Sequence, residues 1–152
     1  SWKGRYHHWD GYPSALGKTL WALYHGYFAR ALRRMADVLL DEHPAGWSSI
    51  NRADFRKEPG YDLEGHPQCY CHGRRSEKAQ EVTEVNAAGM GCEWAYVFDE
   101  GPSMRVLASI SGDDKMIGMF GMGDADATWK EVARVALDGA EPDWEAMEVA
   151  VE

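Results

Sequence analysis

The sequence has few of the residues that would tie the chain together covalently or place it in a membrane. Only three cysteines occur among 152 residues, and this small odd number argues against a disulfide framework. No apolar run approaches the roughly 20 residues that span a bilayer, and the first residues lack the apolar core of a signal peptide. We therefore expect a cytoplasmic protein without a membrane segment, whose cysteines are reduced thiols or metal ligands.

Positive charge is also scarce. The chain has 16 basic and 25 acidic residues and a net charge of −9. Residues 124–152 alone hold nine acidic and two basic residues, a net charge of −7. An acidic chain without a basic stripe argues against nucleic acid as a partner, because that affinity comes mainly from neutralised phosphates. An acidic segment is usually a solvated face, and the alternative is an interaction module that docks on a basic protein surface.

Apolar residues are plentiful, at 45% of the chain, and the length predicts a single domain over residues 1–152. Apolar side chains recur at helical spacing from Leu16 onward, after Ser14 as a capping residue. This pattern predicts a long N-terminal helix that ends before His43. Gly26 is the position where such a helix bends or splits, because glycine costs about 1 kcal/mol in a helix interior.

Strand patterns follow the predicted helix. Residues 93–99 and 104–110 are rich in strand-forming residues and flank a Gly-Pro turn, which predicts a hairpin. Residues 4–9, 68–72 and 115–121 are weaker strand candidates. The order of elements predicts an α+β fold, with an antiparallel sheet packed against the long N-terminal helix.

Two helical patterns are predicted near the C-terminus. Thr128 and Glu131 have the spacing of a capping box, in which each side chain bonds a free amide of the first helical turn. Residues 143–151 show a second, weaker helical pattern, which predicts a short C-terminal helix.

The turn near the N-terminus concentrates residues that bind ligands. If residues 4–9 form a strand, His8 and Asp10 lie on one face, and a carboxylate beside an imidazole fixes its tautomer and raises its pKa. The following helix start offers free amides near Tyr12, Ser14 and Lys18. We therefore expect a small ligand that carries phosphate or carboxylate at this strand-to-helix turn.

Two other interpretations of this turn stay open. In the first, the protein is a hydrolase or transferase in which His8 is the general base and Asp10 orients it. In the second, the residues are structural: Asp10 caps the turn, and His8 is a hydrogen-bonded histidine without a ligand. The sequence does not decide whether the protein is an enzyme.

The cysteines suggest a second site. If residues 68–72 form a strand, Cys69 and Cys71 share a face, and Cys92 or His66 completes a tetrahedral zinc site; His72 then points the other way. A one-residue gap is short for zinc ligands. Buried reduced cysteines that pack as small hydrophobes, or a nucleophilic cysteine beside His72, are the alternatives.

The run His8-Trp9-Asp10-Gly11-Tyr12-Pro13, extended by Ser14–Gly17, resembles a motif of hypothetical proteins from actinobacteria and their phages. The stretches Cys69–Gly73 and Glu93–Val97 are similar to parts of the same proteins. The resemblance implies a shared local structure and a bacterial or phage setting, and it supplies no catalytic residues.

Overall fold

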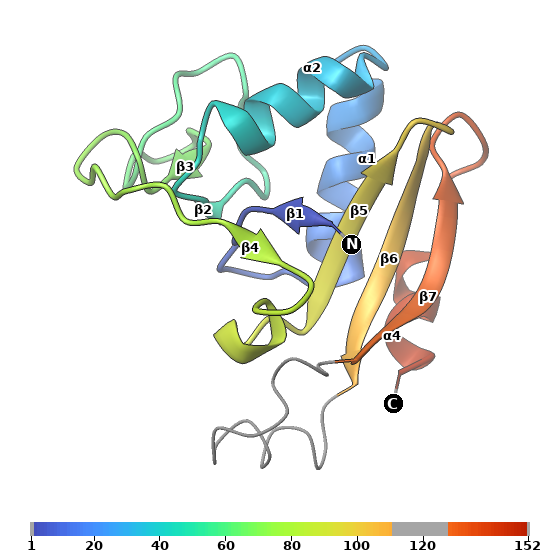
Figure 1. Cartoon of the computed structure of the whole chain (residues 1–152). Coiled ribbons are helices and arrows are strands. Elements are labelled where there is room, and N and C mark those ends of the chain that lie inside the picture. The colour runs from blue at the N-terminus through green and yellow to red at the C-terminus, as the bar shows by residue number, and fades with distance from the viewer. Residues whose placement is uncertain (1, 111–127, 152) are drawn as a thin grey trace. The chain divides into compact units, whose positions relative to one another are not determined.

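Helices and antiparallel strands make up the computed structural model, which describes residues 2–110 and 128–151 (Figure 1). The chain divides into two compact units. The N-terminal unit comprises residues 4–81, and the C-terminal unit comprises residues 82–152 together with residues 1–3. The predicted α+β class with antiparallel sheets is confirmed.

Two short helices stand where the sequence predicts one long helix. Helix α1 (Lys18–His25) is preceded by a π-helical turn, Pro13–Gly17, and helix α2 (Leu32–Ala36) continues into another, Asp37–Asp41. Most of the predicted apolar face is nevertheless buried, whereas Tyr27 is 52% exposed. The buried members are Leu16, Leu20, Leu23, Phe28, Met35 and Leu39.

The helix breaks between Gly26 and Leu32. Ala29 and Arg30 have positive φ angles of 45° and 68°. Left-handed backbone costs about 1–2 kcal/mol per residue, and two such residues in succession end a right-handed helix. Phe28 is buried inside the break. The apolar spacing therefore continues through a segment that is not helical, which is why the sequence predicts an unbroken helix.

The N-terminal unit contains a small antiparallel sheet. Strand β2 (Trp47–Ser49) pairs with strand β3 (Gln68–Cys69), with Trp47 opposite Cys69. The predicted strand over residues 68–72 therefore ends at Cys69. Of the predicted strand over residues 4–9, only Gly4 falls in a regular strand, β1 (Lys3–Gly4).

Residues 7–9 run beside β2 without forming a regular strand. His7 forms a parallel bridge with Trp47, and the His8 amide donates to the Trp47 carbonyl at 3.0 Å. The His7 Nε2 atom accepts the Ile50 amide at 3.2 Å, whereas its Nδ1 atom is buried without a hydrogen-bond partner among the described residues. Burial, and then the charge of His8, lowers the pKa of His7 to about 4. His7 is therefore a neutral, internal histidine at neutral pH.

A three-stranded antiparallel sheet dominates the C-terminal unit. Its strands are β5 (Trp94–Asp99), β6 (Ser103–Ile110) and β7 (Thr128–Ala136), in that spatial order. Tyr96 lies opposite Val106, so the predicted hairpin is confirmed. The unit also contains β4 (Val82–Thr83), a 3₁₀ turn at Ala88–Met90 and α4 (Trp144–Val149).

The prediction of a helix from Thr128 is wrong, because this segment is strand β7. Arg134 lies opposite Arg105 of β6, and the buried Val135 alternates with the exposed Arg134 and Ala136. Hydrogen bonds to β6 satisfy the backbone N–H and C=O groups of every second residue of β7, and this long-range pairing outweighs the local capping pattern. The predicted strand over residues 115–121 lies outside the described residues.

The short C-terminal helix α4 is confirmed. The Asp143 carboxylate caps it by accepting the Ala146 amide at 3.2 Å. Trp144 and Met147, one turn apart, are 5% and 6% exposed. The acidic C-terminal segment is thus anchored in the core of its unit by two large apolar side chains. Within the part of the chain that the structure describes, no helix combines the length and the apolar character needed to cross a membrane.

Candidate metal centre

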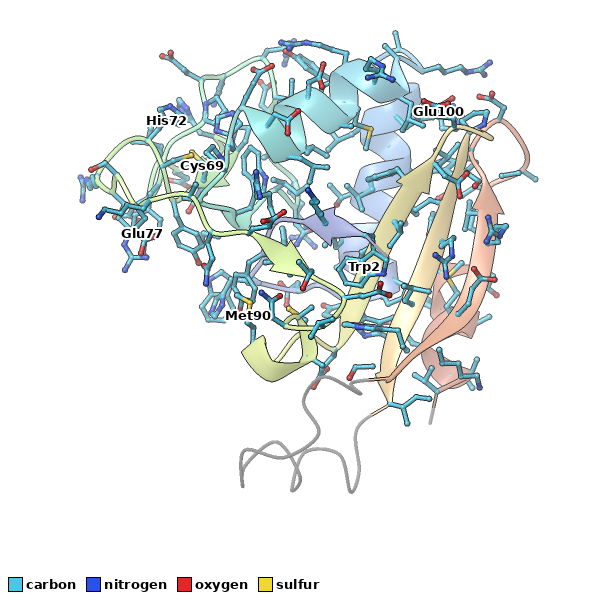
Figure 2. All side chains as sticks on the ribbon, viewed as in Figure 1. Trp2, Cys69, His72, Glu77, Met90 and Glu100 are labelled. Atoms are coloured by element: carbon cyan, nitrogen blue, oxygen red, sulfur yellow. The ribbon has the colours of Figure 1, made fainter. Side chains whose placement is uncertain are left out.

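Four metal-ligating side chains of the N-terminal unit lie together: His43, Cys69, Cys71 and His72. One ligating atom of each lies within 4.8 Å of those of the other three. The Cys69 Sγ atom is 3.4 Å from His72 Nδ1, and the Cys71 Sγ atom is 3.6 Å from His43 Nδ1. Figure 2 shows the labelled side chains of Cys69 and His72 side by side. We call these four residues the Cys–His cluster.

The spacing of the cluster suits a tetrahedral metal ion. Zinc bonds of about 2.3 Å to sulfur and about 2.0–2.1 Å to nitrogen place a sulfur and a nitrogen about 3.6 Å apart. The two measured sulfur–nitrogen distances, 3.4 and 3.6 Å, agree with that separation. Two thiols and two imidazoles also supply the four ligands that a tetrahedral site needs. The Cys–His cluster can therefore hold a metal ion.

Backbone hydrogen bonds bring the two halves of the cluster together. His43 follows the second helical segment and begins a turn in which the Gly46 amide donates to the His43 carbonyl at 3.1 Å. The Tyr70 amide, between the two cysteines, donates to the Gly46 carbonyl at 3.1 Å. Gly46 has a φ of 88°, and a Cβ atom there would lie 2.8 Å from the Tyr6 carbonyl oxygen. Glycine is thus required where the two ligand segments meet.

Cys69 is the innermost ligand. Its side chain is fully buried, and burial is the main cause that raises the pKa of its thiol to about 11. The backbone amides of Cys71 and His72 donate to the Cys69 sulfur, and these bonds act in the opposite direction by favouring the thiolate. Amides aimed at a sulfur are suited to the thiolate that a bound metal requires.

His43 is the second buried ligand. It is 6% exposed, and its ring lies 4.7 Å from the Trp47 ring and 5.1 Å from the His72 ring, centroid to centroid. Burial is the largest cause that lowers the pKa of His43, the charge of His72 adds to it, and Glu42 opposes it. A neutral imidazole keeps a nitrogen lone pair for a metal ion.

The outer side of the cluster is held by a neighbouring loop. The Tyr61 amide donates to the His72 carbonyl at 2.9 Å, and the Gly60 amide donates to the Pro67 carbonyl at 2.9 Å. The Cys71 side chain is half-buried and His72 is exposed. The cluster therefore spans the boundary between the core, at Cys69 and His43, and the surface.

Two of the four metal ligands predicted from the sequence, Cys69 and Cys71, belong to this cluster. His66 is not part of it, and its Nδ1 atom lies 2.7 Å from the Glu58 carbonyl oxygen. Cys92 belongs to the C-terminal unit, where burial raises the pKa of its thiol to about 11.

The two imidazole ligands were missed for different reasons. His72 was expected to point away from the cysteines. Strand β3 ends at Cys69, so the alternation of side chains in a strand does not extend to His72. His43 is 26 positions before Cys69, and nothing in its neighbourhood marks it as a ligand. Only the pairing of β2 with β3 brings it near.

At the N-terminal turn, the structure gives His8 and Asp10 different surroundings. The His8 Nδ1 atom lies 2.8 Å from the Tyr6 hydroxyl, and Asp10 is exposed with a positive φ of 55°. The Asn51 side-chain amide donates to the Trp9 and Asp10 carbonyls at 3.0 and 3.3 Å. Asn51 therefore braces this turn from the opposite segment.

The helix start differs from the expectation as well. Tyr12, not Ser14, is the capping residue, and it makes no side-chain capping bond. Pro13 has no N–H, and the amides of Ala15 and Leu16 both donate to the Tyr12 carbonyl, at 3.0 and 2.9 Å. The helix start thus offers fewer amide donors than the sequence predicts. Lys18, the first residue of α1, is exposed.

No family model, curated protein or solved structure matches this chain. The resemblance of the His8–Pro13 motif to phage and actinobacterial proteins therefore stays a prediction.

Proposed function

We propose that this protein binds one zinc ion in the Cys–His cluster and that the ion stabilises the N-terminal unit. The observation that carries the proposal is the gathering of four ligating atoms within 4.8 Å of one another, from segments 26 residues apart. Each thiol lies beside one imidazole nitrogen, so the four side chains already have the approximate arrangement that a tetrahedral ion needs.

The ligand types favour zinc over other common ions. Thiolate and imidazole are soft or borderline ligands, which magnesium and calcium avoid in favour of oxygen. A tetrahedral set of two sulfurs and two nitrogens is typical of zinc.

The number of ligands favours a structural ion over a catalytic one. Catalytic zinc sites keep one position for water or substrate, whereas four protein ligands fill a tetrahedron. The ion would connect the end of the second helical segment, at His43, to the segment after β3, at Cys69, Cys71 and His72. It would act as a cross-link across the long loop between them.

Metal content and ligand identity are tested together. Protein purified without a histidine tag is analysed for bound elements, and about one zinc per chain is expected. His43→Gln and Cys69→Ser should abolish retention of the ion. His66→Gln and Cys92→Ser are matched controls from outside the cluster, and both should keep it. Zinc that is lost in the control variants but retained in His43→Gln would overturn the proposed ligand set, and the absence of any bound metal would overturn the proposal.

A small anionic ligand at the N-terminal turn is a second, separate proposal. Its support is the strained backbone of Asp10, which Asn51 braces beside the exposed side chains of Trp9 and Tyr12. Strained and braced loops are frequent at binding sites. Lys18 would supply the positive charge. An acid–base pair of His8 and Asp10 has less support, since His8 is bonded to Tyr6 instead.

A further inference from the structure

A cluster of two tyrosines and an arginine lies directly beside the metal-ligating segment. The rings of Tyr61 and Tyr70 are 5.7 Å apart at an interplanar angle of 30°. The guanidinium carbon of Arg75 lies over both rings, 4.6 Å from the Tyr61 centroid and 5.4 Å from the Tyr70 centroid. Two cation–π contacts therefore fix the plane of the Arg75 guanidinium.

Backbone contacts hold Tyr61, Tyr70 and Arg75 in place on several sides. The Tyr61 amide donates to the His72 carbonyl at 2.9 Å, and the Glu77 amide donates to the Tyr70 carbonyl at 2.9 Å. Gly73 has a φ of 81°, and a Cβ atom there would lie 2.8 Å from the Tyr61 nitrogen. Only glycine permits this close approach, so the segment that carries Arg75 is seated against the tyrosines by its backbone.

The hydrogen-bonding edge of Arg75 is left open. Arg75 forms an ion pair with Glu77, whose carboxylate oxygen is 3.8 Å from Arg75 Nη1, a separation beyond hydrogen-bonding distance. Among the described residues, the Arg75 guanidinium has no hydrogen-bond acceptor, and 46% of its side chain is exposed. Arg56 differs, since its Nε and Nη2 atoms donate to the Asp54 carboxylate at 2.9 and 3.0 Å.

The local charge is positive in an otherwise acidic chain. Residues 74–78 contain three basic residues and one acidic residue, and Asp62 pairs with Arg74 at 3.3 Å, which leaves a net charge of +1 in this group, whereas the whole chain carries −9. A planar guanidinium of fixed orientation, with its donors free, matches the paired oxygens of a phosphate group. The neighbouring positive charges favour a doubly charged phosphate over a single carboxylate.

We infer that Arg75, stacked on Tyr61 and Tyr70, binds the phosphate group of a small phosphorylated ligand. The site lies in the N-terminal unit beside the Cys–His cluster, and it is separate from the N-terminal turn that the sequence singles out. Its ligand is either free phosphate or a phosphate attached to a small organic group, as in a nucleotide.

Calorimetric titration with adenosine monophosphate, inorganic phosphate and adenosine tests the inference. Arg75→Ala should weaken binding of both phosphate probes about tenfold or more, the loss expected for a pair of charge-assisted hydrogen bonds. Arg75→Lys should weaken it as well, because lysine keeps the charge but not the planar fork. Tighter binding of the nucleotide than of inorganic phosphate identifies the nucleotide as the ligand class, and equal binding identifies phosphate alone.

Arg56→Ala is the matched control, because this exposed arginine already has its donors bonded to Asp54. It should bind both probes as the wild type does. Wild-type affinity in Arg75→Ala, binding of adenosine equal to that of the nucleotide, or no binding of either phosphate probe at millimolar concentration would each overturn the inference. Zinc content is measured on the same samples, so that loss of the metal and loss of phosphate binding are recorded separately.

Discussion

Removal of the metal ion should destabilise the N-terminal unit by a predictable amount. An ion held by His43 on one side and Cys69 on the other closes a loop of about 27 residues. In the chain-entropy model, a cross-link that closes a loop of this length stabilises the folded state by about 3.5 kcal/mol. For a chain of this size, a loss of about 3.5 kcal/mol lowers the melting temperature by about 7–14 °C.

The assay is urea unfolding of the same protein with zinc and with a chelator. At a free zinc concentration several hundred times the dissociation constant, the free energy of unfolding should be larger than in chelator by about 3–4 kcal/mol. It should change by about 1.4 kcal/mol for each tenfold change in free zinc above the dissociation constant. Tryptophan fluorescence suits the measurement, because Trp47 packs on the ligand His43 in the core of this unit.

Cys69→Ser separates loss of the metal from loss of packing. The buried serine destabilises the protein whether or not zinc is present, so the quantity compared is the difference between the two conditions. That difference should vanish in Cys69→Ser and stay at its wild-type size in Cys92→Ser. A wild-type free energy of unfolding that does not respond to zinc, or an equal response in both variants, would contradict a zinc cross-link at these residues.

Three further predictions concern other parts of the chain. Burial lowers the pKa of His7 to about 4, so as the pH falls the unfolded state takes up a proton before the folded state does. The contribution of His7 to the free energy of unfolding is therefore complete above about pH 6.5, and it falls by about 3 kcal/mol as the pH drops to about 4. Urea unfolding at a series of pH values in the presence of a chelator should show this slope, and His7→Gln should reduce it and leave the part that the lowered pKa of His43 contributes. Trp144 is 5% exposed, so Trp144→Ala should lower the free energy of unfolding by about 3–5 kcal/mol. Val149 is 65% exposed, so Val149→Ala should change it by less than about 0.5 kcal/mol. Similar melting temperatures for the two variants would contradict the placement of α4. At the N-terminal turn, Lys18→Ala should weaken binding of phosphate-bearing metabolites, and equal affinity in wild type and variant, measured by calorimetry, would remove that hypothesis.

The elements that the sequence predicts correctly are set by residues close together in the chain. The sequence predicts the hairpin of β5 and β6 because each run is rich in strand-forming residues and the Gly-Pro turn lies between them. It predicts the C-terminal helix from a short helical pattern, and in the structure the Asp143 cap and the buried Trp144 and Met147 lie within that same segment. In each case the residues that decide the structure are neighbours in the chain.

The failures concern residues whose structure depends on distant partners. Thr128 and Glu131 have the spacing of a capping box, but pairing with β6 supplies more backbone hydrogen bonds than a helix start would. The long N-terminal helix failed where Ala29 and Arg30 adopt left-handed backbone, although neither is glycine. Apolar spacing reports which side chains are buried, and it does not report whether the backbone between them stays helical.

The residue types and their spacing along the chain set the chemistry that is available. Two cysteines are separated by one residue and followed by a histidine, and a short positive segment comes next in an otherwise acidic chain. Tertiary structure decided which residues share a site. His43 reaches Cys71 because β2 pairs with β3 and the Tyr70 amide donates to the Gly46 carbonyl. Contacts across 26 residues depend on strand pairing and loop closure, and no pattern of neighbouring residues records them. For this reason the sequence predicts Cys92 or His66 as the completing ligand and does not point to His43.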